Sequence, residues 1–435
     1  MTGSRAMMED DREQRLAQQY RVVRARSESH CKPLETEDFG LQACPETSPA
    51  KWHLAHTSWF FETFLLRPFL DDYRPLNDQY QYLFNSYYNG IGEQYPRASR
   101  GLLSRPTVAE IFRYREHIDR AILRLLEQDQ HVAREDIERR LILGLHHEQQ
   151  HQELFFTDLK YNFAQNPLWP VYLPAPQTPD AIRPTCPEPD WQRFDAGITM
   201  IGSDNKAFCF DNETPRHRVW LDTFEIATRP VSNADWLAFM RDGGYQRPEL
   251  WLADGWAVVT QEQWHKPLYW VGPEPGDDIG HASIWREFTL HGLRPLDPAA
   301  SVCHLSGYEA DAYARWAGAR LPSEAEWEHA ATTVPIEGHF LDSGLLQPGA
   351  AGSGLSQMFG SVWEWTSSAY GPYPGFQAAE GAIGEYNGKF MCNQLVLRGG
   401  SCVSERSHLR PGYRNFFYPR DRWQFSGLRL ARTVR

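Results

Sequence analysis

The sequence lacks any long apolar segment. No run of about 18 apolar residues occurs in its 435 residues, so no transmembrane helix is predicted. The first residues, Met1 to Gln14, are polar and charged and contain no apolar core of the kind found in signal peptides. These two absences predict a protein without a membrane partner.

Cysteine is also scarce, and its spacing indicates no cysteine chemistry. The seven cysteines are odd in number and scattered, and no Cys-x-x-Cys pair occurs. A disulfide framework normally uses an even number of cysteines at regular spacings. We therefore predict a reduced, cytoplasmic protein in which most cysteines are small packing residues.

Basic residues are fewer than acidic ones. Lys and Arg number 44 against 56 Asp and Glu, which gives a formal net charge of −12. An acidic chain of this kind is not expected to bind nucleic acid or an anionic membrane surface as its main activity. Small ligands respond to local charge, so a small-molecule substrate remains compatible with the composition.

The length predicts two domains, because a single core rarely grows beyond about 250–300 residues. Residues 1–165 show helical apolar spacing, whereas residues 194–435 combine short strands with turns rich in Gly and Pro. The residues between them, 166–193, contain many prolines and are predicted to form a linker or strap. The fold class predicted is therefore α+β, with a helical bundle preceding a domain of short strands.

Four helices are predicted in the first domain. A Ser48-Pro49 pair is typical of a helix start, and Thr107 with Glu110 forms a capping box. A polar-aromatic loop is predicted over residues 80–105. The predicted helices cover residues 7–29, 48–66, 107–129 and 134–163, which favours an antiparallel four-helix bundle. In the second domain we predict a strand over residues 219–226 and helices over 233–241 and 307–317.

A polar stretch on the fourth helix predicts a metal site. His147 and His151 are one helical turn apart, so their rings project from the same face. The pair also fits the pattern His-Glu-x-x-His, in which Glu148 would be the base of a zinc hydrolase. The third ligand of such an enzyme should follow in the sequence, but Leu154 and Thr157 occupy the usual positions.

A third ligand from another helix is better supported. His56 lies on the apolar face of the second helix and is the leading candidate. Three neutral imidazoles suit iron(II), zinc(II) or copper(II). A carboxylate from Glu153 or Glu62 is the alternative ligand, and either could instead accept a hydrogen bond from a ligand histidine.

Two sets of motifs resemble those of a known family. The segment Trp52-His53-Leu54-Ala55-His56, followed by His147-x-x-x-His151-x-Glu153, resembles the DinB-like bundle of the iron-dependent sulfoxide synthases of ergothioneine and ovothiol biosynthesis. The second domain resembles the sulfatase-modifying-factor fold, a variant of the C-type-lectin fold. The segments that carry this second resemblance are 320–328, 360–366, 398–401 and 427–429.

The resemblance implies a reaction and a cofactor. Fe(II) and O₂ would join the sulfur of a thiol to an imidazole carbon of a histidine derivative and oxidise that sulfur to a sulfoxide. His56, His147 and His151 would be the iron ligands. The substrates implied are hercynine (Nα-trimethylhistidine), cysteine and O₂, so the activity that the resemblance implies is that of a hercynylcysteine sulfoxide synthase.

The resemblance also implies substrate contacts. Gln150 and Asn415 match residues that hold the histidine-derived substrate, and Phe416 matches an aromatic position suited to a trimethylammonium group. Members that use γ-glutamylcysteine carry Asp at the next position, where this chain has Phe417, so cysteine is the expected thiol. The residues expected to bind its carboxylate are Arg97 and Arg100, and those expected to supply a proton are Tyr87 or Tyr88.

Other functions remain as alternatives. Formylglycine-generating enzymes share the second fold but need two cysteines where this chain has Ser404 and Leu409. An ovothiol-type 5-histidylcysteine sulfoxide synthase would use histidine itself, and its relatives carry a methyltransferase domain, but no glycine-rich nucleotide loop occurs here. The remaining alternatives are the same reaction with γ-glutamylcysteine, a lectin-like binding protein and a zinc hydrolase.

Overall fold

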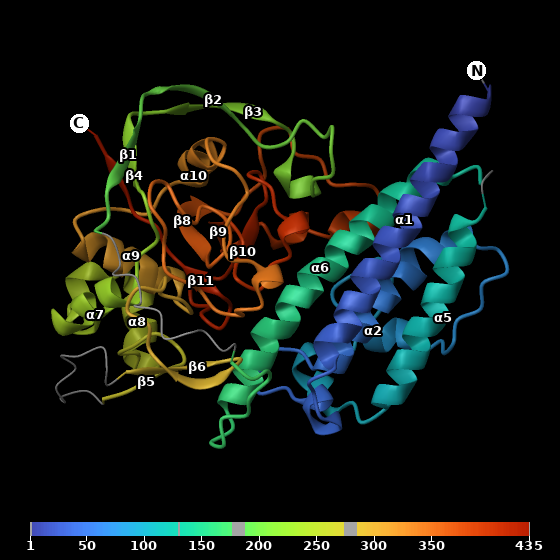
Figure 1. Ribbon diagram of the computed structural model, residues 1–435, viewed down its shortest axis with the longest axis horizontal. Helices are drawn as coiled ribbons and strands as arrows, with labels where there is room; N and C mark the ends of the chain where they lie inside the picture. Colours follow the sequence, from blue (N-terminus) through green and yellow to red (C-terminus); the bar gives the residue numbers. More distant parts are fainter. Residues whose placement is uncertain (1, 129–130, 176–187, 274–284, 435) are drawn as a thin grey trace. The chain divides into compact units, whose positions relative to one another are not determined.

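The computed structural model describes residues 2–128, 131–175, 188–273 and 285–434 (Figure 1). The chain forms two compact units, the first comprising Met1–Asn162 with Ala379–Tyr386 and the second Phe163–Ala378 with Asn387–Arg435. Part of the predicted linker, residues 176–187, lies outside the described residues. The first unit is helical and the second contains short strands, which confirms the α+β class.

Four long helices run side by side in the first unit (Figure 1). They are α1 (Thr2–Cys31), α2 (Ala50–Phe61), α5 (Val108–Leu126) and α6 (Arg134–Ala164). Shorter helices connect them: η1 (Thr36–Gly40), the π-helical turn η2 (Glu62–Leu66), α3 (Arg67–Phe69), α4 (Tyr80–Phe84) and η3 (Arg97–Leu102). No helix among the described residues is long and apolar enough to cross a membrane.

The capping box predicted at the start of α5 is confirmed. The Thr107 hydroxyl accepts a hydrogen bond from the backbone N–H of Glu110, and the Glu110 carboxylate accepts one from the backbone N–H of Thr107 at 2.7 Å. These two bonds satisfy donors that a helix N-terminus leaves without partners. The helix ends at Leu126, slightly before the predicted end.

The Ser48-Pro49 pair precedes α2, but the prediction that the Ser48 side chain caps this helix was wrong. Pro49 occupies the cap position in an extended conformation, and no side chain caps the helix. Ser48 instead contacts other elements: its backbone N–H donates to the Asp158 carboxylate at 2.8 Å, and its hydroxyl accepts from Arg100. Tertiary contacts therefore hold Ser48 away from the local capping geometry that its residue type favours.

The predicted loop over residues 80–105 was wrong in part, because it contains α4 and η3. Its irregular middle is braced by Asn85, which is buried. The Asn85 amide donates to the carbonyls of Tyr88 and Gly92 and accepts from the N–H of Tyr88. Three bonds to one buried side chain fix the path of the loop that follows α4.

The second unit is built from small sheets. The strand orders are β1-β4-β12, β10-β9-β8-β11, β2-β3 and β5-β6-β7. The strands are β1 (Trp191–Phe194), β2 (Gly197–Ile201), β3 (His217–Leu221), β4 (Phe224–Ala227), β5 (Trp270–Val271), β6 (Arg286–Thr289), β7 (Gly292–Pro295), β8 (Trp363–Ala369), β9 (Leu395–Arg398), β10 (Asn415–Phe417), β11 (Ser426–Gly427) and β12 (Ala431–Thr433). The predicted strand over 219–226 is divided between β3 and β4, because these two pair in different sheets.

The helices of the second unit lie close to their predicted positions. α7 (Asn233–Arg241) and α9 (Gly307–Trp316) confirm two predictions, and α8 (Ala253–Gln261) and α10 (Glu324–Ala331) were not predicted. Residues from three of the family-like motifs meet in the core. The Trp327 indole donates to the Glu364 carboxylate at 2.7 Å, and Arg429 binds the same carboxylate at 2.9 Å, all with side chains that solvent does not reach. These motifs therefore build the core of the second unit.

A single glycine permits close packing of α6 on α2. A Cβ placed on Gly144 would lie 2.4 Å from the Phe61 ring, much closer than atoms can approach. Phe61 is fully buried and cannot move towards solvent. Glycine in the middle of a helix usually weakens it by about 1 kcal/mol relative to alanine, so its presence here is explained by the neighbouring ring.

We expect Gly144→Ala to destabilise the protein despite its better helix propensity. Overpacking a core typically costs about 1–3 kcal/mol, which exceeds the gain in propensity. Denaturant unfolding measures the change in free energy. In a Phe61→Leu background, the smaller side chain makes room, so the cost of the same substitution should fall; an equal cost in both backgrounds would contradict the packing explanation.

Candidate metal centre

Three histidines from two helices of the first unit meet inside the bundle. His56 comes from α2, and His147 and His151 come from α6. One ring nitrogen of each lies within 4.8 Å of those of the other two. The Nε2 atoms of His56 and His147 are 3.2 Å apart. The structure therefore brings together the three residues that the sequence analysis selected as ligands.

The ring of His56 is held in one orientation. Its Nδ1 lies 2.6 Å from the carbonyl oxygen of Phe84, which can only accept, so Nδ1 carries the proton and Nε2 carries the lone pair. The indoles of Trp52 and Trp59 stack on the same imidazole at centroid distances of 4.6 and 5.4 Å. The nitrogen available to a ligand is thus Nε2, the atom that faces His147.

The three imidazoles are neutral at neutral pH. Burial lowers the pKa of His147 to about 3. Burial, followed by the neighbouring His147, lowers the pKa of both His56 and His151 well below the usual range. A neutral imidazole is the form that binds a metal ion. The donor set therefore fits a divalent transition metal without requiring a proton to leave first.

A fourth histidine, His53, extends the cluster. Its Nδ1 lies 2.9 Å from Nδ1 of His151, and its Nε2 lies 3.0 Å from the carboxylate of Asp158. His53 and Asp158 are both buried. The sequence analysis gave His53 no role, because helical spacing does not show which residue of α6 it meets.

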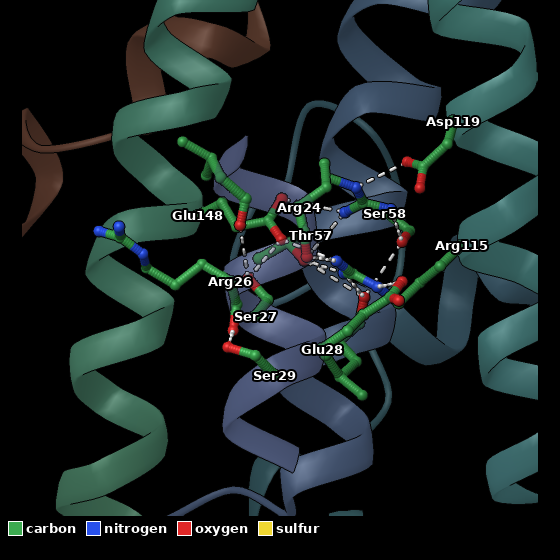
Figure 2. Close-up of polar contacts among 12 residues, drawn as sticks. Arg24, Arg26, Ser27, Glu28, Ser29, Thr57, Ser58, Arg115, Asp119 and Glu148 are labelled. Atoms are coloured by element: carbon green, nitrogen blue, oxygen red, sulfur yellow. Dashed lines mark hydrogen bonds and ion pairs between the residues drawn. The ribbon is translucent and has the colours of Figure 1, made fainter. Parts of the chain in front are cut away.

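Glu148 is not available as a base. Its carboxylate is fully buried and accepts from Ser27 at 2.6 Å, from Arg115 at 2.9 Å and from Arg24 at 3.0 Å (Figure 2). Burial alone would raise its pKa, but the two guanidinium groups and the hydroxyl outweigh burial and lower it to about 2. A carboxylate held in this way cannot activate water, which excludes the zinc-hydrolase alternative.

The two alternative carboxylate ligands lie outside the cluster. Among the described residues, the group that could hold a metal consists of the three histidines alone. Glu62 is buried and binds the hydroxyls of Tyr73, at 2.9 Å, and Tyr114. Its oxygens therefore contact α5 and the segment after α3. Glu153, on α6, is half-buried.

Tyr87 and Tyr88 stack on one another with centroids 4.6 Å apart. Tyr88 is fully buried, and its hydroxyl has no hydrogen-bond partner among the described residues. Burial, followed by the neighbouring Tyr87 and Tyr386, raises its pKa well above the usual value. The Tyr87 hydroxyl lies 3.4 Å from the carbonyl oxygen of Tyr386. The choice of proton donor stays a prediction.

Tyr386 is the site residue that the sequence analysis missed. Its hydroxyl donates to the side-chain oxygen of Gln150, and its ring centroid lies 5.6 Å from that of His147. Glu385 binds the backbone N–H groups of Asn89 and Gly90, which ties this late segment to the loop after α4. The only available signal was a tyrosine in a glycine-rich stretch without predicted secondary structure.

Arg100 and Arg97 have different environments. Arg100 is buried, lies 3.4 Å from the centre of the Trp52 ring, and donates to the Ser48 hydroxyl at 2.9 Å. Burial, followed by repulsion from Arg97, lowers the pKa of Arg100 to about 8. Arg97 is exposed and donates to the carbonyl of Glu46. Within the described residues, neither forms a salt bridge with an acidic side chain.

The three predicted contacts in the second unit lie on β10. The Asn415 side-chain oxygen accepts from the backbone N–H of Phe416 at 2.9 Å. Phe416 stacks on Tyr370 with centroids 4.0 Å apart, and Phe417 meets Trp423 edge-on at 6.1 Å. Phe416 and Phe417 thus each pack against another aromatic ring. The roles of Asn415, Phe416 and Phe417 in substrate binding stay predictions.

Comparisons with known proteins match both halves of the chain. The model of the DinB superfamily matches residues 19–155, and that of the sulfatase-modifying factor enzyme 1-like domain matches residues 182–351 and 343–434. The hercynine oxygenase of Mycolicibacterium thermoresistibile is 31% identical over 428 residues, covering 90% of this chain and 88% of the relative. That of Mycolicibacterium smegmatis is 31% identical over 432 residues, covering 92% and 95%.

A further relative matches about half of the chain. The mouse formylglycine-generating enzyme is 28% identical over 254 residues, covering 49% of this chain and 66% of the relative. At the two positions where the sequence analysis expected the cysteines of such an enzyme, the chain has Ser404, whose hydroxyl accepts from the Ser401 N–H at 2.8 Å, and Leu409, which is buried. These residues cannot form or break a disulfide.

The buried carboxylate predicts a pH-dependent cost of substitution. We expect Glu148→Gln to lower the free energy of unfolding by about 3–5 kcal/mol at neutral pH, because two buried guanidinium groups would lose their countercharge. The folded-state pKa of Glu148 is below its usual value, so its contribution is present above about pH 4.5 and is lost as the pH falls through about 2. Denaturant unfolding at pH 7 and at about pH 3 measures the difference, which should be smaller at the lower pH.

Glu116→Gln is the matched control. Glu116 forms an exposed ion pair with Arg120 on α5, and such pairs contribute less than about 1 kcal/mol. A cost for Glu148→Gln that resembles the control, or that does not change with pH, would contradict the electrostatic explanation.

Proposed function

The chain belongs to the hercynine oxygenase family, and we propose that it joins the sulfur of cysteine to the imidazole ring of hercynine, using O₂ and iron(II) to form a sulfoxide. The observation that carries this proposal is the cluster of three neutral imidazoles in a chain that matches hercynine oxygenases over nine-tenths of its length. Small molecules are accordingly its substrates, a possibility with which the acidic composition is compatible.

The proposed ligands are His56, His147 and His151. Three protein ligands leave positions for substrates, which distinguishes a catalytic site from a closed structural one. Iron(II) held there would supply the redox chemistry with O₂ that no side chain can provide, and its charge would favour the thiolate form of cysteine. The protein contributes neutral, pre-oriented rings and a site that excludes most water.

Gln150 is proposed to hold hercynine. Its side-chain oxygen accepts from the Tyr386 hydroxyl, so its NH₂ group is directed as the donor. Asn415 and Phe416 are proposed to bind the carboxylate and the trimethylammonium group of the same substrate, as the family resemblance implies. Tyr386 thus acts on the substrate indirectly, by fixing the amide.

Arg100 is proposed to bind the carboxylate of cysteine, with Arg97 assisting. Burial makes the charge of Arg100 costly, and no acidic side chain forms a salt bridge with it within the described residues. A substrate carboxylate would supply the missing countercharge, and a guanidinium can bind it through two hydrogen bonds. Proton delivery is assigned to Tyr87 or Tyr88, since the raised pKa of Tyr88 keeps its hydroxyl protonated.

Reconstitution tests the proposal directly. The protein is loaded with Fe(II) without oxygen, and O₂ uptake is then measured with hercynine plus cysteine, histidine plus cysteine, and hercynine plus γ-glutamylcysteine. We expect the first pair to give the highest kcat/KM and a sulfoxide product. No O₂ uptake with any pair would refute the proposal, and preference for histidine would favour the ovothiol type.

We expect His56→Ala to abolish both iron binding and thiol-dependent O₂ uptake, because it removes one of three ligands. Iron content is measured after anaerobic loading and desalting. His117→Ala is the control, since this α5 histidine bonds to the carbonyl of Arg74 and is not in the cluster. Retained iron and activity in His56→Ala would contradict the ligand assignment.

Phe417→Asp is expected to shift the thiol preference towards γ-glutamylcysteine. A carboxylate at this position could bind the amino group of the γ-glutamyl moiety, and one such charged contact gives about a tenfold change in relative kcat/KM. Tyr418→Asp, which adds the same charge at an exposed neighbouring position, is the control. An unchanged ratio of kcat/KM for the two thiols would refute this assignment.

A further inference from the structure

His53 and Asp158 form a buried polar pair behind one of the proposed ligands. His53 lies on α2, three residues before His56, and Asp158 lies on α6, seven residues after His151. The side chains of His53 and Asp158 are 6% and 5% exposed, so water does not provide alternative partners for most of their polar atoms. The pair is therefore confined to the contacts that the two helices supply.

The hydrogen-bond chain has a definite direction. An ionised carboxylate only accepts, so Nε2 of His53 carries a proton and donates to Asp158 at 3.0 Å. The tautomer of His53 that has its single ring proton on Nε2 carries a lone pair on Nδ1. The Nδ1 atom of His151, 2.9 Å away, must donate to it. This leaves the lone pair of His151 on Nε2, the nitrogen that is free to bind a metal ion.

Asp158 is itself held in place. The Asp158 oxygen that accepts the hydrogen bond from His53 also accepts one from the backbone N–H of Ser48 at 2.8 Å. Ser48 precedes the first turn of α2, so this contact anchors the carboxylate to the helix that carries His53. The Asp158 carboxylate, which ends this chain of hydrogen bonds, is thus held by a backbone N–H as well as by the His53 side chain.

The other two proposed ligands are oriented differently. His56 donates to the Phe84 carbonyl, as described above, whereas Nδ1 of His147 is buried with no hydrogen-bond partner among the described residues. His151 is also the least buried of the three, because its side chain is partly exposed whereas His56 and His147 are buried. It therefore depends more than His56 on a partner that selects its tautomer and ring orientation.

We propose that His53 and Asp158 are positioning residues for His151: they fix the tautomer in which its Nε2 can bind iron, and they hold the ring towards His56 and His147. Acceptors behind metal-binding histidines typically contribute a factor of about 10–100 in metal affinity. This inference rests on the proposed metal site but concerns two residues that do not bind the metal themselves.

The test compares two substitutions of His53 by their affinity for metal alone. Fe(II), and Co(II) as a coloured probe, are titrated anaerobically against a chelator competitor. His53→Leu removes the acceptor, and we expect it to weaken binding about 10–100-fold. His53→Asn places a carbonyl oxygen near the former position of Nδ1, so we expect it to restore most of the affinity and the Co(II) absorption spectrum of the wild type.

A second pair of variants does not depend on the His53 substitutions folding. Asp158→Ala removes the end of the chain, and Asn162→Ala is its matched control one turn further along α6. Asn162 is also buried and accepts from the backbone N–H of Ala43 at 2.8 Å in the same connection, but its hydrogen bonds are to Ala43, Thr47 and Leu41 and not to the histidines. We expect weaker metal binding for Asp158→Ala alone, with similar losses of thermal stability in both.

The outcomes separate this inference from the proposed function. Failure of the wild type to bind Fe(II) would reject the metal site as a whole. If the wild type binds Fe(II) and His53→Leu binds it with an affinity within twofold of the wild-type value, the positioning role alone would be overturned. Equal weakening by Leu and Asn, or by Asp158→Ala and Asn162→Ala, would also overturn it, because packing rather than an acceptor would then explain the loss.

Discussion

An ionised carboxylate inside a helical bundle needs cations beside it, and the arrangement of the first unit follows from how Glu148 obtains them. Arg24 reaches it from α1 and Arg115 from α5, while both arginines also bind residues of α2. Figure 2 shows these side chains converging between the helices. Because these three buried charged groups link all four helices, a shift in register of any of them would leave a charge without a partner. That constraint fixes the face that α6 turns towards α2.

Successive residues of α6 illustrate how strongly surroundings decide charge. His147 and Glu148 are adjacent and both fully buried, but they point about 100° apart around the helix axis. Glu148 meets two guanidinium groups and stays ionised. His147 meets other imidazoles and aromatic rings, and burial keeps it neutral. One helix therefore provides a charged face that holds the bundle together and a neutral face that can accept a metal ion.

Several contacts around the candidate site hold its side chains in fixed orientations. Trp52 stacks on His56 and also on Arg100, so the same indole contacts a proposed metal ligand and the arginine that is proposed to bind the substrate carboxylate. Ser48 links Arg100 to Asp158, and through it to His53 and His151. The Tyr386 hydroxyl sets the amide of Gln150. Pre-oriented groups of this kind reduce the reorganisation needed when substrates bind.

The sequence by itself determined the features that depend on short spacings. The pairing of His147 with His151, the capping box at Thr107 and the extents of α6, α7 and α9 could all be predicted, because helical periodicity and capping act within a few residues. The choice of His56 as third ligand came from its apolar face and from family motifs. Only the tertiary structure decided which partners lie across the bundle: the cations of Glu148, the acceptor behind His151 and the position of Tyr386, 236 residues from Gln150 in the chain. No local pattern encodes such contacts, because they arise from the packing of whole helices and from charges that cannot be buried alone.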